Sequence, residues 1–392
     1  MSRTLEEILN TVVITVRTID RSIDISFNGT DRNELNDTVL DAMVNKIHEH
    51  LSNASDIINN CQGECFPPNP LVIGSMVMYR LQERFPNSFG KYIILSAGVD
   101  IEINHRYYKQ HSEKYNLFPA QILFLNNWEY IAGIPENISK YDSILDTSPR
   151  IKPKKFLCFN NGLRSHRFYL VAQFLDDGFL NKAYISCLFR SFQNNKSEML
   201  QIFYNTQLKY QMPTWANDIY NILKKNVDLF PIELNWLHPE DYNKYCFTIE
   251  NDLEYYRNSY FSVITETKFF KDLPNLVEGQ FNGIFLTEKT FKVILAKHPF
   301  ILASFTGSLS ALKSLGYKTF HPYINEEYDL IEDDEKRITI ILEEILRLSN
   351  FTDNEWLDWQ EAVRPIVEYN FQHAAYRYKN RVTYETYQLR SS

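Results

Sequence analysis

Short apolar runs that end in polar or glycine residues alternate with helical patterns along this chain, and this alternation limits its possible folds more than any other feature. KYIILSAG (91–98) and QILFLNNWE (121–129) read as buried parallel strands, and so do KFLCFN (155–160) and AYISCLF (183–189) further on. Residues 36–52 instead carry apolar side chains at helical spacing, which predicts an amphipathic helix. The sequence therefore predicts an α/β fold built on parallel sheets.

The chain is long enough for two domains, because 392 residues exceed what one hydrophobic core usually serves. DTSPRIKPKK (146–155) is polar, basic and proline-bearing, and it lies between segments that look like the ends of separate folds. We therefore predict one α/β domain over residues 1–150 and a second over residues 151–392.

The other predicted elements continue the same alternation. They are a strand pair within 12–28, a helix through 76–85, strands at 245–250 and 260–267, a helix from Thr287, strands at 300–304 and 316–320, and helices at 308–316, 334–349 and 354–381. Residues 155–189 read as strand, polar loop, helix and strand, which is typical of the first βαβ unit of a doubly wound domain.

Charge and hydropathy argue against several kinds of partner. The 49 acidic residues outnumber the 41 basic ones, and a net charge of −8 disfavours a surface wrapped by nucleic acid or held on an anionic membrane. No apolar run approaches the roughly 20 residues that a membrane-spanning helix needs, and the N-terminus has no apolar signal core. We expect a cytoplasmic protein with no membrane partner, and the sequence does not define its oligomeric state.

The cysteines indicate neither a disulfide framework nor a metal site. Five cysteines are scattered along the chain, whereas small secreted proteins carry even sets. Cys61 and Cys65 have three residues between them instead of the two typical of zinc knuckles, and no second ligand pair follows. We expect reduced thiols and no bound metal.

Thr287, Glu288 and Lys289 stand where one of the predicted helices begins. The free N–H groups and positive end of a helix attract phosphate. A glutamate in the first turn can accept both hydroxyls of a ribose, and a neighbouring lysine supplies a charge to a diphosphate. The triplet equally fits a structural role, in which Thr287 caps the helix, Glu288 suits its dipole and Lys289 is solvated.

Two more polar groups follow predicted strands. Arg164 and Arg167 lie in the loop after strand 155–160, at the edge where open α/β sheets bind ligands. His166 and Arg167 also fit as residues that cap or flank the next helix on its solvent side. Glu266 stands near the end of strand 260–267 and should lie near the same crevice, as a hydroxyl acceptor or as a surface residue.

This order of motifs resembles the nucleotide-binding domain of family 10 fucosyltransferases. The segment TEKTFKVILAKHPFILASFTGSLSALKSLGYKTF is also similar to uncharacterised viral and bacterial proteins that carry TEKTFK, PFI, GSL and LGFKTF in this order. The resemblance covers roughly residues 155–325 and leaves the N-terminal half unmatched.

The resemblance implies a GT-B fold, in which two Rossmann-type domains flank a cleft and the C-terminal one holds a nucleoside diphosphate sugar. By position, Glu288 would bind ribose, while Lys289 and Arg167 would bind the diphosphate. Glu266 would bind the sugar or the ribose. Where the family has Glu-Asn, this chain has Glu266-Thr267, so the resemblance does not imply fucose.

The implied reaction needs no metal or other cofactor, because cationic side chains and helix N-termini would stabilise the departing diphosphate. No Asp-X-Asp triplet stands at a suitable strand end. If the reaction inverts, an Asp or Glu of the N-terminal domain must accept the proton of the acceptor hydroxyl. Asp100 and Glu102 are our candidates, with Glu129 behind them, although each also fits as a solvated loop carboxylate.

The sequence leaves two choices open. The acceptor is a glycan or a modified base such as a hydroxymethylated base in DNA, and the net charge favours the glycan. Residues 376–384 interleave basic and aromatic side chains, which fits a nucleic-acid backbone or a helix packed across the domains. The alternative to an enzyme is a GT-B-like scaffold that has lost its donor and serves as a binding or assembly module.

Overall fold

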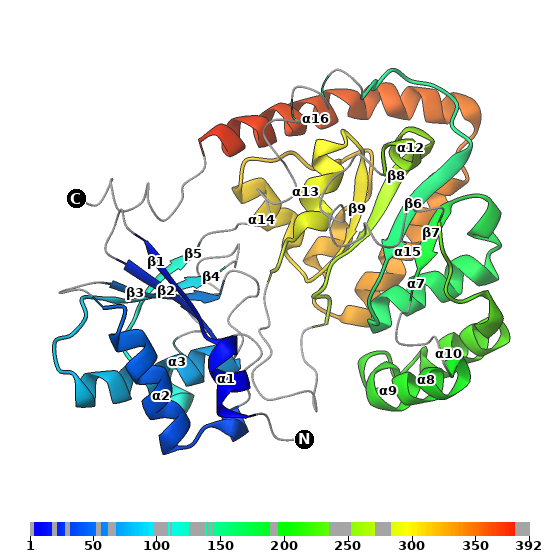
Figure 1. Ribbon diagram of the computed structural model, residues 1–392. Coiled ribbons are helices and arrows are strands. Elements are labelled where there is room, and N and C mark those ends of the chain that lie inside the picture. Colours follow the sequence, from blue (N-terminus) through cyan, green and yellow to red (C-terminus); the bar gives the residue numbers. More distant parts are fainter. Residues whose placement is uncertain are drawn as a thin grey trace. The chain divides into compact units, whose positions relative to one another are not determined.

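The computed structural model describes residues 4–17, 22–27, 32–51, 56–61, 68–96, 109, 112–124, 138, 142, 145–188, 195–234, 252–270 and 284–380. The chain divides into two compact units. The described residues up to 124 belong to the first unit, and those from 138 to 380 belong to the second. Figure 1 shows that each unit has its own sheet.

The first unit contains a five-stranded sheet in the order β1-β2-β3-β4-β5. β1 pairs antiparallel with β2, as the predicted strand pair requires, and β2 to β5 are parallel. The strands are β1 (Val13–Arg17), β2 (Ser22–Ser26), β3 (Asp56–Cys61), β4 (Tyr92–Ser96) and β5 (Gln121–Phe124). The α-helices described in this unit are α1 (Leu5–Thr11), α2 (Asp37–His48) and α3 (Pro68–Arg84).

Helix α2 forms where the apolar spacing predicts it. The side chain of Asn36 caps its first turn by accepting a hydrogen bond from the N–H of Val39. Its apolar stripe is buried, at Val39, Leu40, Met43, Val44 and Ile47. Since burial of each large aliphatic side chain is worth about 1.5–3 kcal/mol, this stripe accounts for the attachment of the helix to the unit.

The second unit contains a four-stranded, fully parallel sheet in the order β7-β6-β8-β9. The strands are β6 (Lys154–Asn160), β7 (Tyr184–Cys187), β8 (Ser259–Thr265) and β9 (Phe300–Ala303). The helices are α7 (Ser165–Asp176), α8 (Lys196–Phe203), α9 (Lys209–Gln211), α10 (Ala216–Lys225), α12 (Leu253–Arg257), α13 (Glu288–Leu295), α14 (Ser308–Ser314), α15 (Asp334–Ser349) and α16 (Asp353–Lys379). Two units with parallel strands and C-terminal helices confirm the predicted α/β, GT-B-like class.

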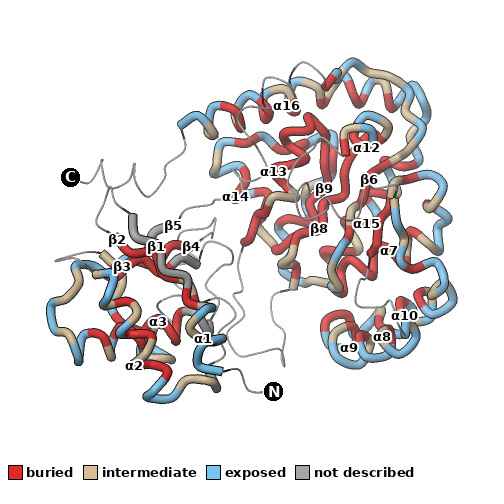
Figure 2. The backbone as a smooth tube through the Cα atoms, viewed as in Figure 1, coloured by how far each residue is buried: buried red, intermediate tan, exposed pale blue. Residues whose placement is uncertain are grey.

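Burial follows the sheet of the second unit. Every residue of β8 is buried, which identifies it as a central strand, and Figure 2 shows the buried stretches gathered on the strands and on the inner sides of the helices. The ring of Trp356, at the start of α16, stacks on Tyr260 of β8 with centroids 3.9 Å apart. No described helix combines the length and apolar character that a membrane crossing requires.

Two predictions about this unit need comment. The predicted strand 316–320 is wrong: these residues form no strand, and the backbone N–H and C=O of Lys318 bond to the side chain of Asn370 at 2.8 Å each. An amide side chain of α16 thus satisfies the backbone groups that a neighbouring strand would otherwise pair. The predicted strand 245–250 lies outside the described residues.

Candidate functional site

The sheet of the second unit reverses its winding between β6 and β8. The ring of Phe156 packs against Phe174 of α7, with centroids 4.8 Å apart. Its neighbour Leu157 must point to the opposite face, because side chains alternate along a strand. There Leu157 lines a pocket together with Lys292 and Val293 of α13. Helices α7 and α13 therefore cover opposite faces, and ligands of open α/β sheets bind at the carboxyl edge of such a switch point.

A pocket of about 280 Å³ opens at this switch point. Its lining combines an apolar floor with a few polar groups, which is the usual composition of a ligand site. The apolar side includes Leu157, Phe159, Tyr256, Val263 and Val293, and the polar side includes Asn160, Arg167, Thr265, Glu288, Lys289 and Lys292.

Arg167 brings a buried positive charge to this pocket. It lies in the first turn of α7 and is 5% exposed. Its guanidinium donates to the carbonyls of Thr265 at 2.9 Å and Gly162 at 3.2 Å, and Nε has no hydrogen-bond partner among the described residues. Burial, and then the charge of Arg164, lower the pKa of Arg167 to about 10, so it remains a cation at neutral pH.

The strongest sign of a ligand is that Arg167 has no ion-pair partner among the described residues, and the charge of Glu266, which raises its pKa, acts on it without direct contact between the charged groups. Buried charges in proteins are normally paired, because leaving one unpaired costs several kcal/mol. No carboxylate of the described part of the chain forms an ion pair with Arg167. A buried cation that lines a pocket in this way fits an anionic ligand.

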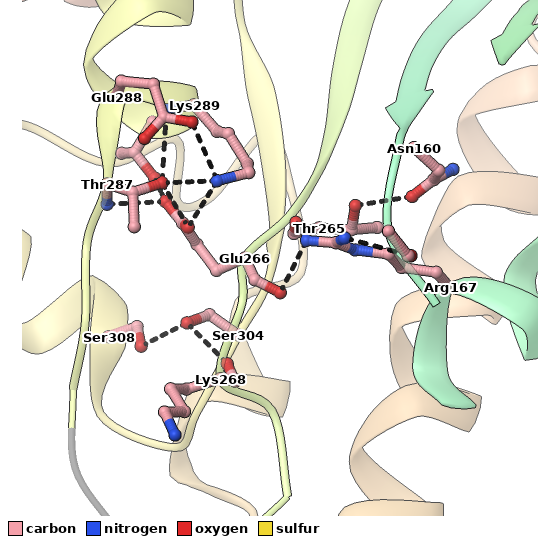
Figure 3. Close-up of polar contacts among 12 residues, drawn as sticks. Asn160, Arg167, Thr265, Glu266, Lys268, Thr287, Glu288, Lys289, Ser304 and Ser308 are labelled. Carbon is pink, nitrogen blue, oxygen red and sulfur yellow. Dashed lines mark hydrogen bonds and ion pairs between the residues drawn. The ribbon is translucent and has the colours of Figure 1, made fainter. Parts of the chain in front are cut away.

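Glu266 fixes the start of α13. Its carboxylate is fully buried and accepts hydrogen bonds from Thr287 N at 2.9 Å, Thr287 Oγ1 at 2.7 Å and Thr290 Oγ1 at 2.7 Å (Figure 3). These contacts satisfy both oxygens and connect the end of β8 to the first turn of the helix. Glu266 is absent from the residues that line the pocket.

The predicted triplet lies at the amino end of α13. Thr287 is the N-cap and accepts from the N–H of Lys289, while Glu288 and Lys289 line the pocket. The ammonium of Lys289 donates to Glu288 Oε1 and to Thr287 Oγ1, both at 2.9 Å. The side chain of Glu288 is 16% exposed and that of Lys289 is 33% exposed, so both are accessible from the pocket.

The structure thus brings Arg167, Glu288 and Lys289 to one pocket. Thr287 and Glu266 do not line this pocket, but they are hydrogen-bonded to each other at the start of the same helix. Arg164 is exposed at the N-cap of α7 and does not line the pocket. The helix begins at Ser165, so Arg167 belongs to its first turn rather than to the predicted loop. Asp100, Glu102 and Glu129 lie outside the described residues.

Three of the polar residues that line the pocket, Asn160, Thr265 and Lys292, were not predicted. Asn160, at the end of β6, accepts from Thr265 Oγ1 at 2.7 Å and joins the two strands at the switch point. Lys292 lines the pocket and forms a buried ion pair with Asp252. Burial raises the pKa of Asp252, and the charge of Lys292 offsets only part of that rise. The spacing of Glu288, Lys289 and Lys292 along one helix face was a usable signal for Lys292.

The described thiols and acids form no obvious metal centre. Among the residues that the structure describes, no three His, Cys, Asp or Glu side chains gather in an arrangement that could hold a metal ion. Cys158 and Cys187 are buried free thiols, and burial raises the pKa of each. Cys65 lies outside the described residues.

Comparisons with known proteins add one solved structure. No protein-family model matches the chain, and no curated protein matches it. A glycosyltransferase from Rickettsia africae ESF-5 is similar over 90% of this chain and 82% of its own, with 11% sequence identity and a TM-score of 0.38.

Proposed function

We propose that this chain is a glycosyltransferase that moves a sugar from a nucleoside diphosphate sugar to a hydroxyl acceptor. The observation that carries the proposal is Arg167, a buried cation without a carboxylate partner, in the same pocket as Lys289 and the amino end of α13. A diphosphate supplies the missing negative charge, and helix N-termini at parallel-sheet edges are common sites for one. The motif order that resembles family 10 fucosyltransferases supports the same ligand.

Each residue then has a distinct role. Arg167 and Lys289 hold the diphosphate and stabilise the charge that develops on it as the glycosidic bond breaks. Glu288 accepts hydrogen bonds from the ribose, because an ionised carboxylate is an acceptor only. Glu266 holds the first turn of α13 at the end of β8 through hydrogen bonds from Thr287 and Thr290, and so positions Glu288 and Lys289.

The reaction also requires that the acceptor hydroxyl be activated for attack on the sugar. We propose Asp100 or Glu102 as the base that takes the proton from the acceptor hydroxyl if the reaction inverts. We also propose that the transfer requires no metal, since the cations of the pocket stabilise the leaving group. The acceptor class that fits the net charge of −8 is a glycan rather than DNA.

A hydrolysis screen across nucleotide sugars tests the proposal. We expect slow release of one nucleoside diphosphate by the wild-type chain, unaffected by a chelator. Lys289→Ala should lower turnover about a hundredfold, because removing one donor from a developing anion typically costs that much. Lys336→Ala, which removes an exposed lysine of α15, is the matched control and should leave turnover unchanged.

One combination of results would contradict the proposal. If no nucleotide sugar is cleaved and no nucleoside diphosphate raises the melting temperature, the chain is a non-catalytic binding module. A ligand at a hundredfold its dissociation constant adds about 2.7 kcal/mol to the folded state, which a thermal shift detects readily.

A further inference from the structure

A second cavity lies at the opposite edge of the sheet from the pocket that contains Arg167. Its lining includes Lys152, Arg257 and Pro299, which come shortly before β6, β8 and β9 in the sequence. Among the described residues, Tyr256 alone lines both cavities. The second cavity has a volume of about 40 Å³. Since a water-sized group needs roughly 10–15 Å³ of such space, about three groups of this size fit in it.

The side chain of Lys152 lines this cavity and is held by an uncharged partner. Its amine nitrogen donates a hydrogen bond to the carbonyl oxygen of Ser259 at 2.7 Å. The backbone N–H of Lys152 donates to the hydroxyl of Tyr260 at 2.9 Å, which fixes the position of the residue. No carboxylate within the described ranges forms an ion pair with Lys152. A carbonyl accepts from a neutral amine as well as from an ammonium, so this contact does not require the charge.

The acids near the cavity are already engaged by other cations. The ion pairs are Asp146 with Arg150, Asp142 and Glu368 with Lys297, and Glu361 with Arg364. Arg257 adds a positive charge to the lining, and the buried ring of His298 is neutral. Loss of the charge on Lys152 therefore breaks no ion pair and removes a repulsion from its cationic neighbours.

The amine of Lys152 is partly neutral under ordinary conditions. Burial, and then the charge of Arg150, lower the pKa of Lys152 to about 7, while the charge of Asp146 opposes this change. About half of these side chains are then neutral at pH 7, whereas an ordinary lysine is neutral in less than about 0.1% of molecules. A neutral primary amine carries a free electron pair and is a nucleophile.

Carbon dioxide matches both the size and the charge of this cavity. The amine nitrogen forms a bond to its carbon, one C=O bond breaks toward oxygen, and one proton leaves the nitrogen for water. The product is a carbamate anion, which adds three heavy atoms to the side chain, as many as the cavity admits. Its remaining N–H can still donate to Ser259, and the positive charges of Arg150 and Arg257 favour the anion.

We propose that Lys152 is a site of reversible carbamylation by carbon dioxide, in a cavity separate from the pocket that contains Arg167. The modification replaces a poorly tolerated cation by an anion beside the segment 145–150, where Gln360 of α16 bonds to both backbone groups of Arg150. Only the folded chain forms the cavity, so carbon dioxide should stabilise the second unit.

Trapping in ¹³C-labelled bicarbonate buffer tests the proposal on the full chain. Triethyloxonium converts a carbamate into a stable ethyl ester, and mass spectrometry of proteolytic peptides locates the label. We expect at least about tenfold more label on Lys152 than on Lys154 at neutral pH. The yield should rise as the pH increases through about 7, because the neutral amine is the reacting form.

Lys154 is a matched internal control. It belongs to the same basic stretch, and its amine also donates to a backbone carbonyl, that of Asn181 at 2.6 Å, but it does not line the cavity. Added bicarbonate should raise the melting temperature of the wild type and of Lys154→Arg. It should leave Lys152→Arg unchanged, because a guanidinium stays protonated and does not react.

Three results overturn the proposal. One is a wild-type chain that carries no label on Lys152, a measurement that needs no variant to fold. Another is equal labelling of Lys152 and Lys154, which shows that the cavity has no effect. The third is stabilisation by bicarbonate without any label on Lys152, which shows that the cavity binds the anion without a covalent bond.

Discussion

The guanidinium of Arg167 is held by backbone carbonyls rather than by an acidic side chain. Contacts to Gly162 and Thr265 fix its orientation without neutralising its charge. The group is therefore set in place before any ligand arrives, and its charge is available to one. Such preorganisation lowers the entropy that binding must overcome.

Replacing Arg167 by lysine should separate charge from geometry. An ammonium keeps the positive charge but lacks the planar fork that serves two carbonyls and a phosphate together. We expect Arg167→Lys to weaken binding of a nucleoside diphosphate at least about tenfold, the loss of a charge-assisted hydrogen bond. Calorimetry measures the change, with Arg364→Lys, at a partly exposed position of α16, as control. Equal affinity in Arg167→Lys and the wild type would contradict the assigned role.

The sequence predicted that Arg167, Glu288 and Lys289 lie close together, and they do. It did not predict that the carboxylate of Glu266 binds the start of α13 instead of facing the pocket. The first three follow from topology, because parallel strands deliver their carboxyl ends, and the helices that follow, to one edge. The direction of the Glu266 side chain depends on where Thr287 and Thr290 lie in three dimensions. Strand order in the sheet, which the sequence alone does not specify, determines that placement.

At the scale of elements, α16 does more than cover the second unit. Asn370 is 1% exposed and binds both backbone groups of Lys318, so this helix holds the segment that follows α14. The apolar and aromatic residues of 316–320 explain why the sequence favours a strand there. The absence of a strand follows from a contact between residues 52 positions apart, which no local pattern reports.

Asn370→Ala should therefore destabilise the chain although it removes no apolar contact of note. The two backbone groups of Lys318 lose their partner, and each such loss costs about 1–3 kcal/mol where water cannot replace it. Asn354→Ala, at an exposed position of the same helix, is the matched control and should change the unfolding free energy by less than about 0.5 kcal/mol. Urea unfolding compares the two. Equal stability of both variants would show that Asn370 does not hold the segment.

At the scale of the whole molecule, the alternation of strands and helices predicted α/β units, because neighbouring parallel strands must be joined by crossover connections, which are usually helices. The limits of the units depend on packing that the sequence does not show. The described residues 145–150 belong to the second unit, where Gln360 bonds to both backbone groups of Arg150. A polar, proline-bearing stretch can therefore be part of a packed unit.

Buried histidine should make the second unit sensitive to acid. His298 donates from Nε2 to the carbonyl of Ser259 and accepts from the hydroxyl of Ser262, both at 2.8 Å, so the ring is neutral. Burial, and then the charge of Lys152, lower its pKa to about 3. Below pH 6.5 the unfolded chain binds a proton that the folded chain does not. The unfolding free energy therefore falls as the pH drops from 6.5 toward 3.

For His298 alone the expected loss is about 2 kcal/mol between pH 7 and pH 5. His298→Gln should lose correspondingly less over that interval, whereas His321→Gln, at an exposed position, should behave like the wild type. Tryptophan fluorescence during urea unfolding reports the relevant unit, because Trp215, Trp356 and Trp359 all lie in it. The same pH dependence in all three chains would contradict the role of His298.

A crystal structure of the chain with the nucleoside diphosphate selected by the screen tests the central claim most directly. We predict phosphate oxygens within hydrogen-bond distance of the Arg167 guanidinium and of Lys289 Nζ, with the ribose hydroxyls on Glu288. A nucleotide bound elsewhere, with Lys289 still on Glu288 and no anion beside Arg167, would contradict the account.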